Sequence, residues 1–275
     1  PGLAMGNAVG SIICDTGLIL GVACLIRPLT IPWEIANRQG WVQLACGFLI
    51  VLLSLPWPAP LSPYTDGAEG LFPQWAGFLC LALLAVYLWV SVKWSMKSGS
   101  NPATLEENES ETGDEHSASA AVLIVKIVLA LAGVILSASV LIPAVTIIAV
   151  RMSIPESIIA ATLVAFGTSL PELVTAVQAA RKGHGDLAVG NIIGADILNA
   201  LFVAGAAAAV TPAGLTIAQS FFWPAFPAML FVLIVFRIGI YVCRTQLTRR
   251  FGVVLLAAYF AYLGLSIAAG VAPGH

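Results

Sequence analysis

The segment AVGNIIGADILNALFVAG (188–205) aligns without gaps with AMGNAVGSIICDTGLILG (4–21) at an offset of 184 residues. Each copy is followed by Leu-Thr-Ile (29–31 and 215–217) and then by further apolar segments. Small and polar residues recur at five matched positions: Ala4/Ala188, Gly6/Gly190, Asn7/Asn191, Gly10/Gly194 and Gly21/Gly205. Such matches inside apolar segments are not expected from composition alone, so the chain contains an internal repeat.

The composition is that of a membrane protein. Of the 275 residues, 59% are hydrophobic and only 9% are charged, whereas a soluble domain has about one quarter charged residues. Apolar segments of about 20 residues, the length that a helix needs to cross a bilayer, recur along the chain. We therefore predict an all-α integral membrane protein. Its eight expected transmembrane helices cover about 3–26, 36–56, 73–95, 120–148, 154–180, 187–211, 217–242 and 250–271.

One polar segment, SGSNPATLEENESETGDEHSASA (98–120), divides the chain. It holds six of the fourteen acidic residues and has no apolar periodicity, as expected of a solvated linker. We therefore predict a first half at 1–97 with about three transmembrane helices, the acidic linker at 98–120, and a second half at 121–275 with about five.

The distribution of basic residues predicts the orientation. If residues 27–38 are cytoplasmic and the spans alternate in direction, only Arg151 lies outside, while Lys126 and Arg237 lie within spans near their cytoplasmic ends. The basic residues on the cytoplasmic side are then Arg27, Arg38, Lys93, Lys97, Arg181, Lys182, Arg244, Arg249 and Arg250. This bias predicts a multi-pass protein of the cell (inner) membrane with a cytoplasmic linker. The two copies of the repeat then cross the membrane in opposite directions, so the repeat is inverted.

Glu172 lies in an apolar segment, where a carboxylate costs about 2.5–3.5 kcal/mol unless it faces a polar cavity. Thr168 shares its helix face and Ser169 is one step round the helix. Pro171 has no N–H and leaves the carbonyl of Gly167 without its usual helical partner. These are hard oxygen donors, which suit Na⁺ or Ca²⁺. The alternative is a kinked helix with a protonated glutamate bonded to a neighbouring helix.

The two copies of the repeat supply further polar side chains. In the first copy a stripe of polar residues recurs every four positions, Asn7, Ser11 and Asp15. In the second copy the equivalent stripe is Asn191, Ala195 and Asn199, with Asp196 nearby. The glycines beside the stripes would let helices approach closely. In the alternative interpretation the asparagines only join helices and bind no ion.

GTSLPEL (167–173) followed by GNIIGADILN (190–199) resembles the second α-repeat of the calcium/cation antiporter superfamily, specifically its prokaryotic sodium/calcium exchanger branch. GNAVGSIICD (6–15) resembles the latter half of the first α-repeat. The resemblance implies two inverted five-helix halves, alternating access and an ion site at the midplane. It also implies the ligands, namely Thr168, Ser169, Glu172 and the carbonyl of Ala165, with Ser11, Asp15 and, opposite them, Asn199.

The chain departs from the family pattern G-S-N-I-F-[ND] in both repeats. The prokaryotic pattern ends in Asn in the first repeat and Asp in the second, whereas this chain has Asp15 and Asn199. Ala195 removes a hydroxyl, and Asp196 places a carboxylate, a further candidate ligand, where Asn is usual. The oxygen donors still suit Ca²⁺, but ion preference and stoichiometry are not predicted.

The leading functional hypothesis is a secondary antiporter that exchanges Ca²⁺ for Na⁺ as substrates in a lipid bilayer, with no cofactor and no nucleic-acid partner. Coupling to H⁺ in place of Na⁺ is the alternative. An intramembrane enzyme is disfavoured because all three histidines, His116, His184 and His275, lie outside the predicted spans. A channel would usually need subunit symmetry, whereas this chain carries its own.

The repeat symmetry also predicts a segment that precedes Pro1. The 184-residue offset places the counterpart of Glu172 about a dozen residues before Pro1, and eight spans are two fewer than the implied ten. We therefore expect the reading frame to continue upstream through two more helices, and the 275-residue chain alone to be inactive.

Overall fold

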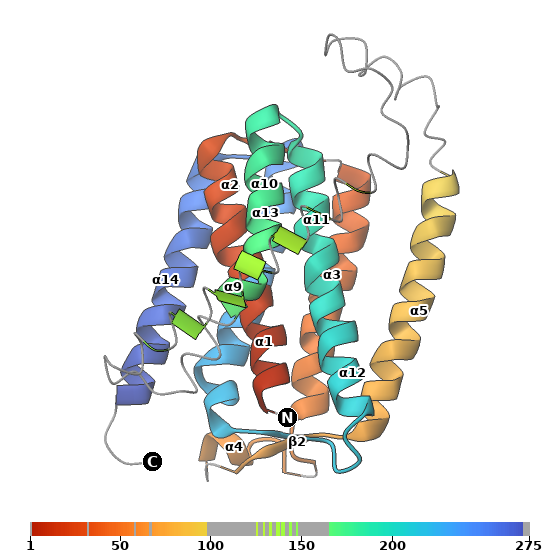
Figure 1. Cartoon of the computed structure of the whole chain (residues 1–275), viewed down its shortest axis with the longest axis vertical. Coiled ribbons are helices and arrows are strands. Elements are labelled where there is room, and N and C mark those ends of the chain that lie inside the picture. The colour runs from red at the N-terminus through yellow and green to blue at the C-terminus, as the bar shows by residue number, and fades with distance from the viewer. Residues whose placement is uncertain are drawn as a thin grey trace.

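A computed structural model of the chain describes residues 2–97 apart from 32, 58, 66 and 67, scattered positions between 125 and 147, and residues 165–271. The predicted linker, the predicted span at 120–148 as a whole and the first part of the span at 154–180 lie outside the described residues. The described part is a bundle of long helices (Figure 1).

From α1 and from α11 onward, the two halves share one sequence of elements, in which a helix with a π-helical segment is followed by a short strand, a long helix, a second short strand and a second long helix. In the first half they are α1 (Gly2–Ile13), the π-helical segment η1 (Cys14–Ile19), α2 (Leu20–Ile26), β1 (Leu29–Thr30), α3 (Trp33–Ser54), α4 (Ser62–Thr65), β2 (Gly70–Phe72) and α5 (Gln74–Lys97). In the second half they are α9 (Ala165–Thr168), α10 (Leu170–Lys182), α11 (Gly185–Leu198), η3 (Asn199–Val203), α12 (Ala204–Ala209), β3 (Leu215–Ile217), η4 (Phe221–Ala225), α13 (Phe226–Cys243), β4 (Gln246–Leu247) and α14 (Arg249–Val271).

Within the described residues, five continuous helices are long and apolar enough to cross a membrane. They are Ala4–Ile26, Gln74–Trp94, Gly185–Ala209, Phe221–Cys243 and Arg249–Ala268, and they match five of the predicted spans. The predicted span at 36–56 corresponds to α3, which has 22 residues. Polar residues in the first turns of α3, such as Asn37, Arg38 and Gln39, make this helix less apolar than the other five.

The two copies of the repeat have the same backbone. Each begins as an α-helix and widens into a π-helical segment, η1 or η3, and the two segments contain an equivalent hydrogen bond. The N–H of Leu20 donates to the carbonyl of Asp15, and the N–H of Ala204 donates to the carbonyl of Asn199. Wide turns of this kind inside α-helices are rare and occur frequently at functional sites. The repeat found in the sequence is therefore a structural repeat as well.

Equivalent glycines form the helix crossings beside each copy. A Cβ atom on Gly252 of α14 would lie 2.7 Å from the carbonyl oxygen of Gly21 on α2. In the other half, a Cβ atom on Gly77 of α5 would lie 2.6 Å from the carbonyl oxygen of Gly205 on α12. The predicted close approach thus occurs at Gly21 and Gly205. It does not occur at Gly194, where a Cβ atom would meet no described atom within 4 Å.

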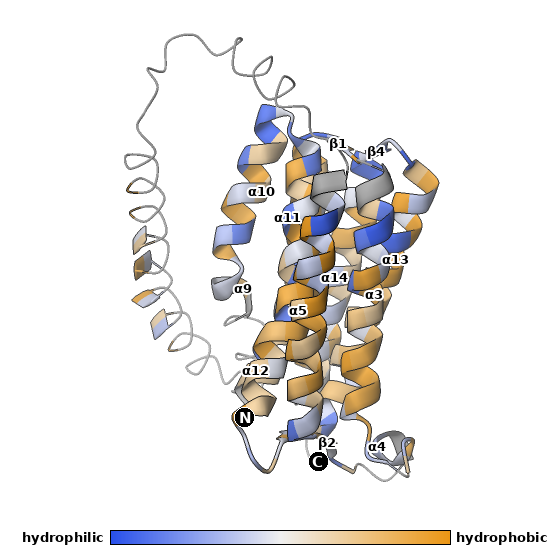
Figure 2. Ribbon diagram, turned by 90° about the vertical axis from the view of Figure 1, so that its right-hand side faces the viewer, coloured by the Kyte–Doolittle hydropathy of each residue, from blue (hydrophilic) through white to orange (hydrophobic). Residues whose placement is uncertain are grey.

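Two short antiparallel strand pairs show that the repeat is inverted. β1 pairs with β4 through Leu29↔Leu247 and Thr30↔Gln246. β3, which holds the second Leu-Thr-Ile segment, pairs with β2 through Phe72↔Leu215 and Gly70↔Ile217. The β1–β4 pair and β2 lie at opposite ends of the bundle (Figure 2). Because β1 and β3 are equivalent in the repeat, the two halves run in opposite directions.

The basic residues gather at the end of the bundle that holds β1 and β4, where hydrophilic residues are concentrated (Figure 2). Lys182 ends α10, Arg244 lies in the turn between α13 and β4, and Arg249 begins α14. Arg27 lies between α2 and β1, and its guanidinium group lies beside Gly183 in the α10–α11 turn. A Cβ atom added to Gly183 would be 2.7 Å from the Nη1 atom of Arg27. One end of the bundle is therefore basic, as the charge pattern predicts for the cytoplasmic side.

Candidate ion-binding site

The two equivalent polar residues of the repeat meet in the middle of the bundle. The Nδ2 atom of Asn199 donates to the Oδ2 atom of Asp15 at 3.5 Å, across a separation of 184 residues. This separation equals the offset of the repeat, so the contact lies on the pseudo-twofold axis. Asp15 is completely buried, and its Oδ1 atom has no hydrogen-bonding partner among the described residues. The structure therefore brings together the predicted residues Asp15 and Asn199.

The polar stripe of the first copy faces the short helix α9. The hydroxyl of Thr168 donates to the Oδ1 atom of Asn7 at 2.9 Å. The Oγ atom of Ser11 lies 3.2 Å from the Oγ1 atom of Thr168. Ser11 and Thr168 were both predicted from the sequence, on segments 157 residues apart, and they are direct neighbours.

Glu172 lies in the first turn of α10, directly after a break between two helices. Ser169, with φ −89° and ψ 6°, separates α9 from α10, and Pro171 follows within the first turn. The break agrees with the predicted effect of the proline, since Pro cannot continue the hydrogen bonds of a preceding helix. The N-terminal end of α10 also favours a negative charge. The Oε2 atom of Glu172 is buried and has no hydrogen-bonding partner among the described residues.

The other two predicted ligands of this segment are Ser169, which forms the break, and the carbonyl of Ala165 at the start of α9. Ser169 is 2% exposed, and its hydroxyl interacts with the Asp15 carboxylate. Ala165 is the first residue of α9, at the edge of the described range. The α9–α10 break thus brings Thr168, Ser169 and Glu172 to the face that the first copy of the repeat presents.

Asp196 has a different environment. Its Oδ2 atom accepts a hydrogen bond from the hydroxyl of Thr16 at 2.5 Å and another from the Nε2 atom of Gln43 at 2.5 Å. Neither Thr16 nor Gln43 was predicted as a site residue. A signal for Gln43 was present, since it is an uncharged polar residue within the predicted span at 36–56. Thr16 directly follows Asp15, but a single threonine in an apolar helix is no signal.

Asn191 does not join the central group. Its Nδ2 atom donates to the hydroxyl of Thr175 on α10 at 3.0 Å. The hydroxyl of Thr175 in turn donates to the carbonyls of Pro171 and Glu172, each at 3.0 Å. The side chain of Asn191 therefore joins α11 to α10.

The site combines three acids with neutral oxygen donors. Asp15 interacts electrostatically with both Asp196 and Glu172, and Asp196 interacts with Glu172. Among the described residues, however, no three His, Cys, Asp or Glu side chains are close enough to hold a metal ion by themselves. An ion bound here would therefore also use hydroxyl, amide or carbonyl oxygens, which are the ligands of hard cations such as Na⁺ and Ca²⁺.

The inverted repeat, the apolar helices and the buried acids define a membrane transporter with internal pseudo-twofold symmetry. The sequence pattern of the family described as sodium/calcium exchanger protein matches residues 1–93 and 122–268. The chain therefore belongs to the sodium/calcium exchanger family, which consists of transporters and not of enzymes.

Individual relatives agree with this assignment. The chain is 30% identical to the sodium/calcium exchanger MaX1 of Methanosarcina acetivorans over an alignment 284 positions long, which covers 95% of this chain and 79% of that protein. It is 31% identical over 264 residues to the inner membrane protein YrbG of Escherichia coli, with 96% and 76% covered. An uncharacterized membrane protein of Methanocaldococcus jannaschii is 31% identical over 197 residues, which cover 72% of this chain but only 57% of that protein.

A solved structure has the same fold. The sodium-calcium exchanger NCX_Mj, soaked with Na⁺ and Sr²⁺, superposes with a TM-score of 0.68 at 25% sequence identity. The superposition covers 96% of this chain and 77% of that chain. The likeness supports the inverted-repeat antiporter fold over almost the whole chain.

Proposed function

We propose that this protein exchanges Ca²⁺ for Na⁺ across the membrane at a central site, by alternating access. The observation that carries the proposal is the meeting of Asp15 and Asn199 on the pseudo-twofold axis, at the point where both copies widen into π-helical segments. A site on this axis has the same position relative to each of the two inverted halves. Two related conformations can therefore open it to opposite sides of the membrane.

The proposed ligands of the transported ion surround this point. They are the side chains of Glu172, Thr168, Ser169, Ser11, Asp15 and Asn199 and the carbonyl of Ala165, with Asp196 as a neighbouring cation ligand. The unpartnered buried oxygens of Asp15 and Glu172 support this set, because an acceptor without a donor or a cation is costly in a membrane interior. The mixture of charged and neutral oxygens suits an ion that must be released as well as bound.

The charge of the site is also consistent with exchange. Two Na⁺ or one Ca²⁺ would balance the ionised carboxylates of Asp15 and Glu172, so the two kinds of ion can replace one another at similar electrostatic cost. The relative MaX1 is named a sodium/calcium exchanger, and NCX_Mj was soaked with Na⁺ and Sr²⁺, a divalent cation like Ca²⁺.

Vesicle flux tests the function directly. The protein expressed from its complete reading frame is reconstituted into vesicles, and uptake of radioactive Ca²⁺ is measured with an outward gradient of Na⁺ or of H⁺. The proposal requires uptake that depends on the Na⁺ gradient and is absent from protein-free vesicles. Uptake driven only by the H⁺ gradient would replace Na⁺ by H⁺ as the coupling ion, and no uptake under either gradient would contradict the antiport.

A further inference from the structure

Asp196 is the buried acid whose surroundings the resemblance does not explain. It is 1% exposed and lies between three elements, with its Oδ2 atom held by Thr16 of η1 and Gln43 of α3. Gln43 also donates to the hydroxyl of Thr16 at 3.3 Å, which closes a triangle of polar groups. The residues of this triangle, Thr16, Gln43 and Asp196, are here called the Asp196 cluster.

No positively charged side chain among the described residues pairs with the Asp196 cluster. The Oδ1 atom of Asp196 is buried and has no hydrogen-bonding partner among the described residues. The charged groups that act on Asp196 are Glu172 and Asp15, which are both acids. Because an ionised carboxylate in the membrane interior needs a counter-charge, the free oxygen is a position for a cation.

The donors of the cluster suit a monovalent cation better than Ca²⁺. One carboxylate, one hydroxyl and one amide carry a single negative charge between them, whereas Ca²⁺ takes six to eight oxygens. The Gln43 amide can present its Oε1 atom to a cation after a rotation that exchanges its nitrogen and oxygen. All three groups would then offer oxygens to one small ion.

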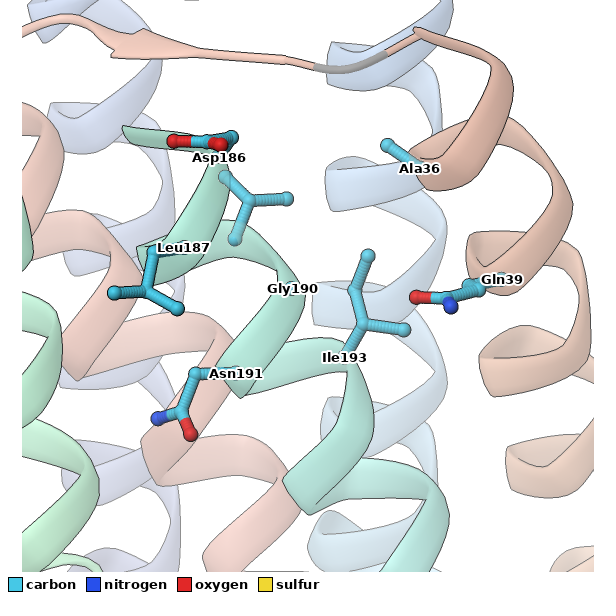
Figure 3. Close-up of a pocket in the computed structure, with 8 residues that line it drawn as sticks. Ala36, Gln39, Asp186, Leu187, Gly190, Asn191 and Ile193 are labelled. Carbon is cyan, nitrogen blue, oxygen red and sulfur yellow. The ribbon is translucent and has the colours of Figure 1, made fainter. Parts of the chain in front are cut away.

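A pocket lies near the cluster, at the basic end of the bundle. It has a volume of about 280 Å³ and lies between the beginnings of α3 and α11. Gln39 and Ile193 are among its lining residues (Figure 3). Gln39 is one helical turn before Gln43 on the same face of α3, and Ile193 is one turn before Asp196 on α11. The cluster therefore lies one turn below the pocket, whereas Ser11 and Thr168 lie farther toward the opposite end.

We propose that Asp196, Thr16 and Gln43 hold a second cation position, which binds a monovalent cation such as Na⁺ and is filled through the pocket between α3 and α11. This position is distinct from the group of Glu172, Thr168, Ser11 and Asp15. The proposal rests on the proposed exchange function. It assigns a role to Asp196, the acid that stands where the family pattern has Asn.

The test measures Na⁺ binding and Ca²⁺ binding separately on the purified intact protein. Equilibrium dialysis against radioactive Na⁺ counts the ions bound to wild type and to Thr16→Val, Gln43→Leu and Asp196→Asn. We expect each variant to bind one Na⁺ fewer, or to need at least about threefold more Na⁺, as expected for the loss of one oxygen ligand. Ca²⁺ affinity without Na⁺ should stay within about twofold of wild type in Thr16→Val and Gln43→Leu.

Two controls separate this position from general damage. Thr16→Ser retains the hydroxyl and should restore Na⁺ binding. Ser54→Ala removes another buried hydroxyl of the bundle, one that donates only to the carbonyl of Ile50 within α3, and should not change it. Unchanged Na⁺ binding in all three variants would overturn the proposal, and so would a parallel loss of Ca²⁺ affinity in Thr16→Val and Gln43→Leu.

The outcome is independent of the transport assay. A wild-type protein that binds Na⁺ through this cluster but moves no Ca²⁺ in vesicles would contradict the proposed exchange and leave the second position standing. If the wild-type protein exchanges the two ions and the variants bind Na⁺ normally, the exchange function stands and the second cation position is contradicted.

Discussion

The two copies of the repeat share a backbone but differ in where they carry charge. In the first copy the carbonyl that accepts the wide-turn hydrogen bond from Leu20 belongs to Asp15. In the second copy the equivalent residue is the neutral Asn199, and the acid, Asp196, lies three residues earlier. Both copies nevertheless have the same helix crossing, at Gly21 and Gly205. The comparison shows that backbone geometry and close glycine contacts maintain the symmetry, while the polar side chains are free to break it.

The largest effect is expected at Glu172, which has no counterpart among the described residues of the first half. Glu172→Gln keeps the shape of the side chain and removes its charge. Because the variant removes one negative charge from the proposed ligands of the ion, we expect Ca²⁺ uptake into vesicles to fall by about 100-fold or more, corresponding to about 3 kcal/mol for a buried charge partner. Normal uptake would exclude Glu172 as a ligand.

The amount of protein in the membrane serves as a check on this variant. Glu172→Gln should insert normally, since replacing the carboxylate lowers the cost of burial. Glu69→Gln makes the same chemical change at an exposed position outside the bundle core and should leave uptake unchanged.

The second prediction concerns a transfer of the negative charge of Asp15 to Asn199, across the pseudo-twofold axis. Asp15→Asn makes the two copies equally neutral at this position. We expect Ca²⁺ affinity to fall by about 10- to 100-fold, because one charged oxygen is replaced by an amide oxygen. Adding Asn199→Asp should restore part of the affinity, because the two side chains face the same point. Titration of the purified protein with Ca²⁺ measures both changes.

Two results would contradict this view of the axis. An Asp15→Asn protein with normal Ca²⁺ affinity would make Asp15 a structural residue. A double variant no better than the single one would mean that the ion contacts only one copy of the repeat.

The third prediction concerns the symmetric crossings. Gly252→Ala and Gly77→Ala each place a methyl group within 3 Å of the backbone of a neighbouring helix. Overpacking of this kind costs about 1–3 kcal/mol, so both variants should unfold at lower temperature in the same detergent. Gly264→Ala on α14 is the matched control, because a Cβ atom there meets no described atom within 4 Å. Equal stability of all three variants would show that the crossings are not tight.

The smallest effect is expected for the neutral ligands. Ser11→Ala removes one hydroxyl from the pair that it forms with Thr168. The loss of one neutral oxygen should weaken Ca²⁺ binding by about 2- to 10-fold, corresponding to about 0.5–1.5 kcal/mol. Ala195→Ser, which adds a hydroxyl at the equivalent position of the second copy, should not weaken it. A loss at Ser11 as large as that at Glu172 would show that charge does not dominate the site.

Much of the site was predictable from the sequence. Pro171 and the neighbouring hydroxyls singled out Glu172, and the repeat offset made Asp15 and Asn199 equivalent positions. The partners of Asp196 were not predictable, because they come from η1 and α3, and the rotation of each helix about its own axis is set by packing. Asn191 was expected in the polar stripe of the second copy, yet it contacts Thr175. Helical periodicity predicts which residues share a face, but not which neighbouring helix that face meets.

By itself, the sequence determined that this chain crosses a membrane, that it contains a repeat and that acids lie within its apolar helices. The physical reason is that insertion into lipid penalises each polar residue locally, so length, hydropathy and spacing carry this information. Only the tertiary structure decided where the helices widen into π-helical segments and that Asn199 reaches Asp15. It also decided that Thr16 and Gln43 surround Asp196. These contacts join residues far apart in the chain, and they depend on how close and at what rotation the helices pack.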